Sequence, residues 1–187
     1  EPAIFVSSAD VEYALIRIDN TTGNNFSIRG NYLGGSAPSL AGQWVKTGQN
    51  NVFYGIYLNV GSSGTTSVQD NRLANLSYTN AGNASFTAIH VASGLVSIGT
   101  ENGNSIGFST GNQAILFKSG ASDGIFYGIR IASQQAVTVA NNLLGSITTD
   151  NSNASYATHF YGIAKDAGAG DVTVQNNTIG SLTSNNS

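Results

Sequence analysis

A pattern of alternating apolar and polar residues recurs five times along the chain. The most regular copy spans Phe126–Ile147, where the apolar Ile129 and Ile131 lie on either side of Arg130. Alternation over short runs bounded by Gly, Asn and Ser is typical of half-buried strands. No window of a dozen residues carries the 3.6-residue apolar stripe of a helix. The pattern therefore predicts an all-β chain.

The five copies align on the isoleucine of their first apolar run, and the alignment predicts how the strands are arranged. Steps between successive isoleucines are 40, 33, 40 and 34 residues, so a long repeat alternates with a short one. Repeats of this length indicate a solenoid. In a parallel solenoid, equivalent residues of successive rungs lie about 4.8 Å apart, which favours columns of similar side chains.

Such columns are present. An aromatic column is formed by Tyr13, Phe53, Phe86, Phe126 and Phe160, and an isoleucine column by Ile16, Ile56, Ile89, Ile129 and Ile163. A hydroxyl column is formed by Ser27, Ser67, Ser97, Thr138 and Thr173. An antiparallel meander would instead need two-residue turns between successive strands, and Asn102-Gly103 is the one strong candidate for such a turn. We therefore predict a single domain over residues 1–187, a right-handed parallel β-solenoid of about five rungs with alternating long and short repeats.

An asparagine column supports the same arrangement. It consists of Asn31, Asn71, Asn104, Asn142 and Asn177. A stacked side-chain amide donates a hydrogen bond to one neighbour and accepts one from the next, so the column is expected to form a structural ladder. Asparagine also tolerates a left-handed backbone, which predicts that these residues occupy a tight corner of each rung.

The segments VTVANNLLG and VTVQNNTIG give this repeat a family resemblance. They resemble the repeat of right-handed parallel β-helix proteins of the pectate-lyase-like architecture. Most of all, they resemble the Asn-rich repeats of large secreted bacterial surface proteins. The resemblance covers nearly the whole chain and implies a fold. It does not assign an activity, because one fold serves many functions.

Composition narrows the possible partners and locations. Only 9% of the residues are charged, the net charge is −3 and the pI is about 5.1, which argues against a nucleic-acid partner. The chain has no cysteine and no apolar run of the roughly 18–20 residues that a membrane span needs. It opens at Glu1 without a leader, as expected for a secreted protein whose signal peptide has been removed. We expect an extracellular or cell-surface location.

Candidate chemistry is sparse. Enzymes of the resembled architecture would have clustered carboxylates, but Asp70 faces glycine positions in the neighbouring repeats, and Asp19 and Asp166 stand three rungs apart. No catalytic residue, metal or cofactor is therefore predicted, and the chain is not expected to be an enzyme. One outward column is a candidate glycan-binding surface, with an ordinary solvated face as the alternative. It comprises Arg17, Tyr57, His90 and Arg130.

Both ends of the chain are candidates for contacts with other rungs. The first segment, AIFVSS, resembles ILFKSG of a long rung, and the last, NTIGSLTSNNS, precedes the place where such a segment would be due. Joining the end of one copy to the start of the next restores a long step. The predicted junction residues are Ala3, Ile4, Phe5, Val6, Lys165, Ile179 and Leu182.

Two explanations remain open for these ends. Separate subunits could stack head to tail into a filament, with the N-terminal strand of one completing the last rung of the other. The chain could also be a window of a longer tandem array. The predicted function is a structural extracellular subunit whose partners are copies of itself. The alternative is a glycan-binding or glycan-cleaving module of the adhesin or tailspike type, with surface glycans as partners.

Overall fold

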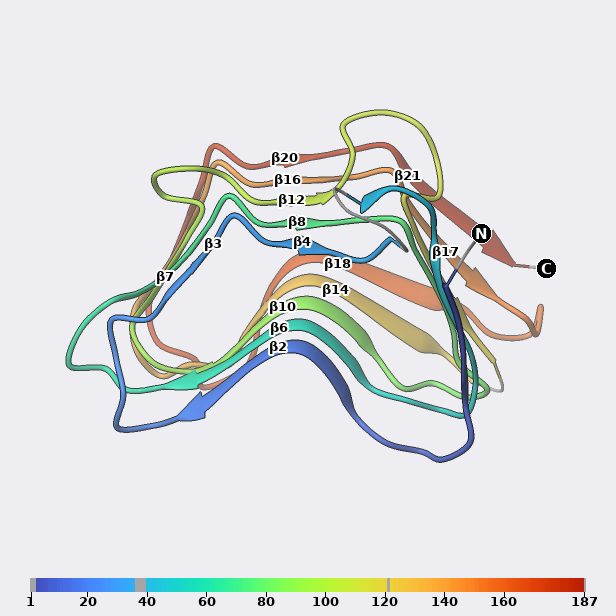
Figure 1. Cartoon of the computed structure of the whole chain (residues 1–187), viewed down its shortest axis with the longest axis horizontal. Coiled ribbons are helices and arrows are strands. Elements are labelled where there is room, and N and C mark those ends of the chain that lie inside the picture. The colour runs from blue at the N-terminus through green and yellow to red at the C-terminus, as the bar shows by residue number, and fades with distance from the viewer. Residues whose placement is uncertain (1–2, 36–39, 121, 187) are drawn as a thin grey trace.

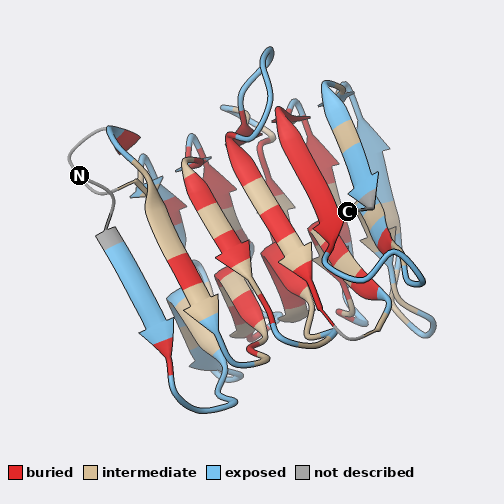
Figure 2. Cartoon of the chain, turned by 90° about the vertical axis from the view of Figure 1, so that its right-hand side faces the viewer, coloured by how far each residue is buried: buried red, intermediate tan, exposed pale blue. Residues whose placement is uncertain are grey.

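The computed structural model describes residues 3–35, 40–120 and 122–186, and in these residues every strand pairing is parallel. The strands form four sheets, here named A to D, and each turn of the chain visits them in that order (Figure 1). Seen from the N-terminal end, β2, β3 and β4 follow one another clockwise while successive turns recede, so the coil is right-handed (Figures 1 and 2). The predicted parallel β-solenoid is confirmed.

Sheets A and B form two sides of the coil. Sheet A has six strands, in the order β1 (Ala3–Ser7), β5 (Trp44–Gly48), β9 (Leu76–Thr79), β13 (Ile115–Ser119), β17 (Ile147–Asn151) and β21 (Leu182–Asn186). Sheet B has five longer strands, β2 (Tyr13–Asn20), β6 (Phe53–Val60), β10 (Phe86–Ser93), β14 (Gly124–Ile131) and β18 (Thr158–Lys165).

Sheets C and D close the cross-section. Sheet C contains β3 (Ser27–Arg29), β7 (Thr66–Gln69), β11 (Val96–Ile98), β15 (Val137–Ala140) and β19 (Val172–Gln175). Sheet D contains β4 (Tyr32–Leu33), β8 (Arg72–Leu73), β12 (Ser105–Gly107), β16 (Leu143–Gly145) and β20 (Thr178–Ile179). Asn102-Gly103, the candidate for a hairpin turn, instead joins two sheets at a corner between β11 and β12.

The strand registers confirm the predicted columns. The aromatic, isoleucine and hydroxyl columns are each paired Cα to Cα from the first rung to the fifth. Phe53, Phe86 and Phe126 are fully buried, with ring centroids 4.4 Å and 4.9 Å apart along the stack. Figure 2 shows the result from outside sheet A: the middle strands are largely buried and the edge strands β1 and β21 are largely exposed.

The asparagine ladder is confirmed along its full length. The side-chain Nδ2 of Asn31 donates to Oδ1 of Asn71 at 2.8 Å, and Asn71 donates in the same way to Asn104 at 2.9 Å. The series continues through Asn142 to Asn177. Each receiving Oδ1 also accepts the backbone N–H of the preceding ladder residue. The ladder therefore satisfies buried backbone groups at the corner between sheets C and D.

The predicted left-handed backbone lies one residue earlier than expected. Positive φ angles occur at Gly30, Asp70, Asn141 and Asn176, each of which directly precedes a ladder asparagine. The ladder residues themselves have ordinary backbone angles. The prediction was wrong on this point because the turn and the ladder use adjacent residues: one reverses the chain, and the next points its amide inward.

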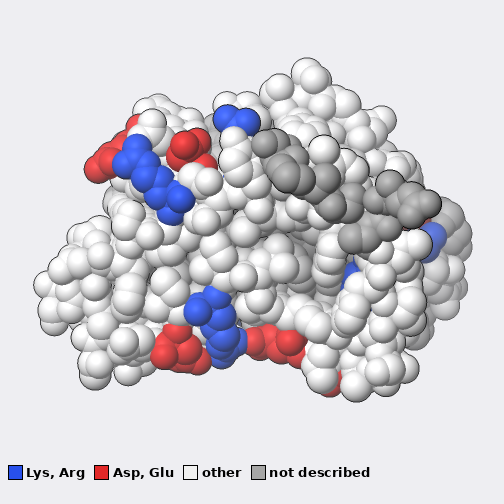
Figure 3. Space-filling view, viewed as in Figure 1, with Lys and Arg blue, Asp and Glu red and all other residues white. Residues whose placement is uncertain are grey.

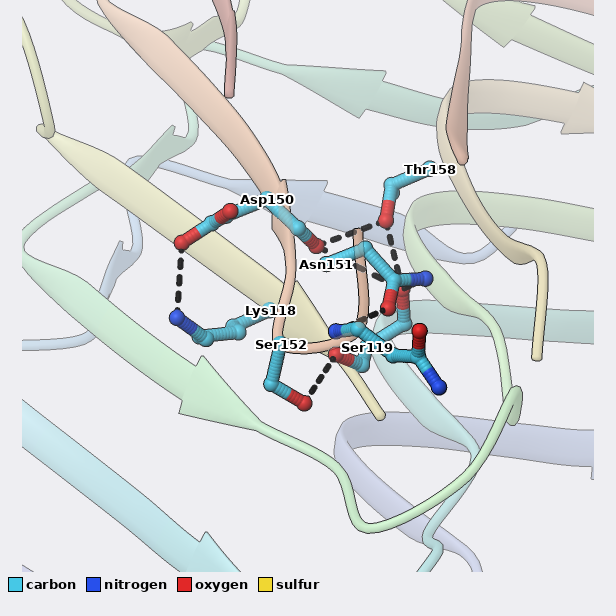
Figure 4. A network of polar contacts seen from close by, with 7 residues as sticks. Lys118, Ser119, Asp150, Asn151, Ser152 and Thr158 are labelled. Carbon is cyan, nitrogen blue, oxygen red and sulfur yellow. Dashed lines mark hydrogen bonds and ion pairs between the residues drawn. The ribbon is translucent and has the colours of Figure 1, made fainter. Parts of the chain in front are cut away.

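A second polar column lies at the corner between sheets A and B. In the later rungs Ser119 and Thr158 share a hydroxyl hydrogen bond, Asn151 Nδ2 donates to Ser119 Oγ at 3.0 Å, and Lys118 pairs with Asp150 at 2.8 Å (Figure 4). In an earlier rung the fully buried Lys46 is also surrounded by hydrogen-bonding groups at this corner. Its ammonium donates to Asn80 Oδ1 and to two backbone carbonyls.

Candidate functional site

The most unusual surface of the coil is the outer face of sheet B. All five strands of this sheet bend inward, toward sheet D, at one column (Figure 1). Small residues occupy that column in the inner rungs, at Gly55, Ala88 and Gly128. A Cβ on Gly128 would lie 2.2 Å from Leu144 Cδ2 in sheet D. The same Cβ would lie 2.5 Å from Gly162 O, so the close approach at this column favours small residues.

The bend changes which side chains face outward. On β6 the outward residues are Tyr54 and Tyr57, which are three positions apart instead of two or four, because Gly55 and Ile56 between them are both buried. Two outward columns consequently lie side by side. We name their members the outer cluster: Arg17, Tyr54, Tyr57, Thr87, His90, Tyr127, Arg130 and Tyr161.

Aromatic contacts join the two columns. The Tyr54 ring lies 5.1 Å from that of Tyr57 and 5.3 Å from that of His90, measured between centroids. Further along the axis, Tyr127 stacks on Tyr161 at 5.4 Å, and the Arg130 guanidinium lies 4.9 Å from the Tyr127 centroid. Flat, stacked rings of this kind form a surface suited to the apolar face of a sugar ring.

The two arginines of the outer cluster are already paired with carboxylates. Arg17 binds Asp19 at 3.0 Å and also contacts Glu12, while Arg130 binds Asp166 at 3.0 Å. The hydrogen bond from Arg17, followed by one from Asn59, lowers the pKa of Asp19. Figure 3 shows one face of the molecule, on which Lys and Arg side chains lie against Asp and Glu side chains. The cluster therefore presents little net charge.

The outer cluster contains two buried polar side chains, those of His90 and Thr87. His90 is 7% exposed and Thr87 is fully buried, although both side chains leave the outer face of β10. Within the described residues, His90 Nδ1 and Thr87 Oγ1 have no hydrogen-bond partner. Burial, aided by the nearby charge of Arg130, lowers the pKa of His90 to about 4. The imidazole is therefore neutral at pH 7.

His90 makes the fold sensitive to acid. Its folded pKa of about 4 is below the ordinary value of 6.5, so the unfolded chain takes up this proton first as the pH falls. The free energy of unfolding should therefore decrease between about pH 6.5 and pH 4, by up to about 3 kcal/mol from this residue. Urea denaturation across that pH range measures the loss. The substitution His90→Phe, which keeps a ring against Tyr54, should flatten the profile.

The other histidine provides the control. His159 lies exposed on β18, so His159→Phe should leave the acid-dependent loss in place. An equal loss of stability in the parent chain and in His90→Phe would contradict the assignment to His90.

The predicted ligand-binding residues share a column, as expected, but one of them is not exposed to solvent. Arg17, Tyr57, His90 and Arg130 form one outward column, yet His90 is buried rather than solvated. The sequence analysis missed the second column, which consists of Tyr54, Thr87, Tyr127 and Tyr161. Strict alternation along a strand places these residues on the inward face. The available signal was the tripeptide Phe-Tyr-Gly at 53–55, 126–128 and 160–162, whose glycine marks the bend.

A separate pocket of about 390 Å³ opens near the asparagine ladder. It is lined by Asp70, Arg72, Phe108, Asn141 and neighbouring residues, and Gly103, a predicted neighbour of Asp70, is among them. Asp70 is the one carboxylate among its lining residues. Across the described residues, no three His, Asp or Glu side chains gather as a metal site needs. Nor does any helix there have the length and apolarity to span a membrane.

The C-terminal end of the coil leaves its core open. Val174, Ile179 and Leu182 belong to inward columns, but 44–51% of each is exposed. The residues that precede them in these columns, one rung earlier, are at most 1% exposed. Lys165 is exposed at the same end, in the column of the buried Ile131. These residues therefore lie where another rung would cover them.

The N-terminal end is open along the edge strand of sheet A. Ile4 and Val6 are 67% and 66% exposed, and Phe5 is 39% exposed. The backbone of Ala3 begins the pairing of β1 with β5. The similarity between the first segment and ILFKSG is confirmed, since β1 and β13 belong to the same sheet.

One prediction about the C-terminal end is wrong. Residues 182–186 do not stop short of the last strand of sheet A; they form it, as β21 paired with β17. Sheet A consequently has six strands where the other sheets have five. The polar segment Leu182–Asn186 was not recognised as a strand because only its register against β17, and no apolar alternation, identifies it.

Comparison of the chain with family models, with curated proteins and with solved structures found no match. The coil itself, a right-handed parallel β-solenoid, therefore defines the class of protein to which the chain is assigned.

Proposed function

We propose that the chain is a structural, extracellular β-solenoid subunit that stacks head to tail into a filament. The observation that carries the proposal is the exposure of inward columns at the C-terminal end, where Val174 is 51% and Ile179 45% exposed at positions that a further rung would cover. An end that exposes both core side chains and strand edges is normally covered in a solenoid. The likeness to Asn-rich surface proteins of the pectate-lyase-like architecture supports the extracellular setting.

A second copy of this chain fits the open end. Its first rung would extend the columns, placing Tyr13 of the next copy on Phe160 and Ile16 of the next copy on Ile163. Tyr13 and Ile16 are themselves only partly buried at the N-terminal end. Both ends thus offer the same cross-section and matching apolar positions.

The asparagine ladder gives the stack a direction. From Asn31 to Asn142, each ladder residue donates toward the C-terminal end. In the described residues Asn177 therefore accepts from Asn142 but donates to no ladder neighbour, and Oδ1 of Asn31 accepts from none. Placing Asn31 of the next copy above Asn177 would continue the series with unchanged polarity. Contact between two C-terminal ends would instead bring donors against donors, so head-to-tail stacking is favoured.

Electron microscopy and light scattering of the purified 187-residue chain test this function. We expect unbranched fibres that gain about 24 Å per subunit, which is five rungs of about 4.8 Å. Ile179→Asp should prevent them by placing a charge on the open core, whereas Gln135→Asp adds the same charge on an exposed turn and should not. A monomer that stays monomeric at high concentration, with no fibres, would rule the function out.

The outer cluster supports a second candidate, a glycan-binding module of the adhesin or tailspike type. The specific observation is a stacked aromatic surface beside the unpartnered His90 Nδ1 and Thr87 Oγ1. Sugar hydroxyls both donate and accept hydrogen bonds, and sugar rings stack on tyrosine. Binding would require movement of the rings that cover His90.

A glycan array tests this candidate. Tyr57→Ala combined with Tyr127→Ala should abolish retention, because both rings belong to the outer cluster. Arg17→Ala with Arg130→Ala should weaken retention by releasing the rings that these guanidiniums cover. Tyr32→Ala, on an exposed ring of sheet D, is the control. An array profile that none of these changes alters would discard the outer cluster as a glycan site.

A further inference from the structure

Sheet A contains one strand more than a head-to-tail stack can hold. Strands β1 to β20 make five complete turns, and β21 begins a sixth. If β18, β19 and β20 pair with β2, β3 and β4 of the next copy, the β1 of that copy must lie next to β17. That position is already filled by β21. Since one sheet position accepts one strand, β21 and the incoming β1 exclude each other.

We propose that β21 is a displaceable placeholder, which the β1 strand of the next copy replaces when two copies stack. The inference rests on the proposed stacking function and adds a step to it. In the free chain β21 covers the edge of β17, and during assembly it is released. The strand that takes its place beside β17 is the segment Ala3–Ser7 of a second copy.

Side-chain chemistry decides which of the two strands is released. Phe5 belongs to the inward column and is 39% exposed, so inserting β1 would bury its ring. Ile4 and Val6 face outward at 67% and 66% exposure, and insertion would cover each of them in part. The partly buried Val45 and Leu116, in the column of Ile4, are covered in this way within the coil. Releasing β21 exposes one apolar side chain, Leu182, which is already 44% exposed, and otherwise polar residues that water solvates well. The backbone pairing that each strand offers is five residues long in both cases. Burial of apolar surface therefore favours β1.

The inward positions point the same way. The third residue of each sheet A strand forms a column that includes the buried Tyr78 and Phe117. In this column β1 has Phe5 and β21 has Ser184. Ile, Phe and Val also favour strands, while Asn does not. The incoming strand thus matches the column better than the strand it would replace.

Attachment to the rest of each chain differs as well. Strand β1 is fixed to its own rung, because Phe5 packs edge-on against Tyr13 at 5.3 Å and Ser7 Oγ hydrogen-bonds with the Tyr13 hydroxyl at 3.0 Å. Strand β21 follows Ser181, whose φ is 52°. The Ser181 hydroxyl donates to Ser109 O at 3.1 Å and needs no part of β21 for this contact. Release of β21 therefore leaves the preceding corner in place.

The absence of cysteine from the chain allows a direct test by disulfide cross-linking. Thr149→Cys and Ser184→Cys lie on directly paired residues of β17 and β21, so their oxidation would hold β21 in place. We expect the oxidised variant to form no fibres and the reduced variant to recover them. Ser97→Cys with Thr138→Cys joins paired residues of β11 and β15, away from both ends, and should assemble in either state.

A second variant detects the exchanged strand itself. Ile4→Cys with Thr148→Cys leaves Phe5 in place and changes the second residue of the incoming β1 and of β17. It should form disulfides between copies in assembled fibres, giving a ladder of oligomers on a non-reducing gel, and none in dilute monomer. Removal of residues 182–187 should shorten the lag before fibres appear. Equal assembly of the oxidised and reduced locked chains, or the lack of cross-links in fibres, would overturn the exchange while leaving stacking intact. Failure of the unmodified chain to assemble would instead overturn the proposed function.

Discussion

Replacing Phe86 with alanine should lower the free energy of unfolding by about 3–5 kcal/mol. Phe86 is fully buried in the middle of the aromatic stack. Its ring lies 4.4 Å from that of Phe53 and 4.9 Å from that of Phe126, and Tyr78 and Phe117 also contact it. Truncation removes contacts to rungs on both sides. The cavity cannot close, because the paired backbones fix the spacing between rungs.

Urea denaturation followed by circular dichroism measures this loss. Phe108→Ala is the matched control, since Phe108 is 43% exposed and lies outside the stack, and it should cost far less. Because stability in a solenoid is transmitted between neighbouring rungs, unfolding of the Phe86→Ala chain is expected to begin in the middle of the coil. A loss below about 1 kcal/mol would contradict the role given to the aromatic column, since full removal of a buried ring costs several times more.

Replacing Asn104 with alanine should cost about 3 kcal/mol or more, although the side chain is small. Its Oδ1 accepts hydrogen bonds from the Asn71 backbone at 3.0 Å and from Asn71 Nδ2 at 2.9 Å. Its Nδ2 donates to Asn142 Oδ1 and to the carbonyl of Val68. Asn104 is 2% exposed, so the groups left without a partner would be buried. Each buried polar group without a partner costs about 1–3 kcal/mol.

The first member of the ladder provides the comparison. Asn31 lies partly exposed in the end rung, so water can take the place of the hydrogen bonds that Asn31→Ala removes. The loss of stability should therefore be clearly smaller than for Asn104→Ala. Asn104→Asp tests the direction of the ladder, because a carboxylate still accepts but no longer donates. Similar losses for Asn31→Ala and Asn104→Ala would show that the ladder does not act through buried hydrogen bonds.

Most of the coil follows from the sequence because its columns are chemically redundant. Any one of the aromatic, isoleucine, hydroxyl or asparagine columns fixes the register of the rungs, and all four give the same register. Asn104 was predicted to join the ladder although it lies seven residues after Ser97 of the hydroxyl column, where the spacing in the other rungs is four. The structure places it in the ladder. Consistency among independent columns makes the prediction of a parallel coil strong.

Three features were not predicted from the sequence: the bend of sheet B, half of the outer cluster, and strand β21. None of them leaves a repeated side-chain pattern. The inward bend of sheet B brings Gly128 close to Leu144 of sheet D, and no repeat encodes such a distance between sheets. The outer cluster follows from that bend, so half of its members were missed. Strand β21 is held chiefly by backbone pairing, which polar residues such as Thr183 and Asn185 provide as well as apolar ones.

The orientation of the backbone hydrogen bonds also has a mechanical consequence. In every sheet these bonds run between rungs, along the axis of the coil. A force that pulls the ends apart would load them directly and release the chain one rung at a time. A folded rung contributes about 4.8 Å to the length. The roughly 33–40 residues of one released rung can extend to about 110–140 Å. The chain would therefore behave as a stepwise extensible tether, lengthening more than twentyfold in each released rung before any covalent bond carries the load.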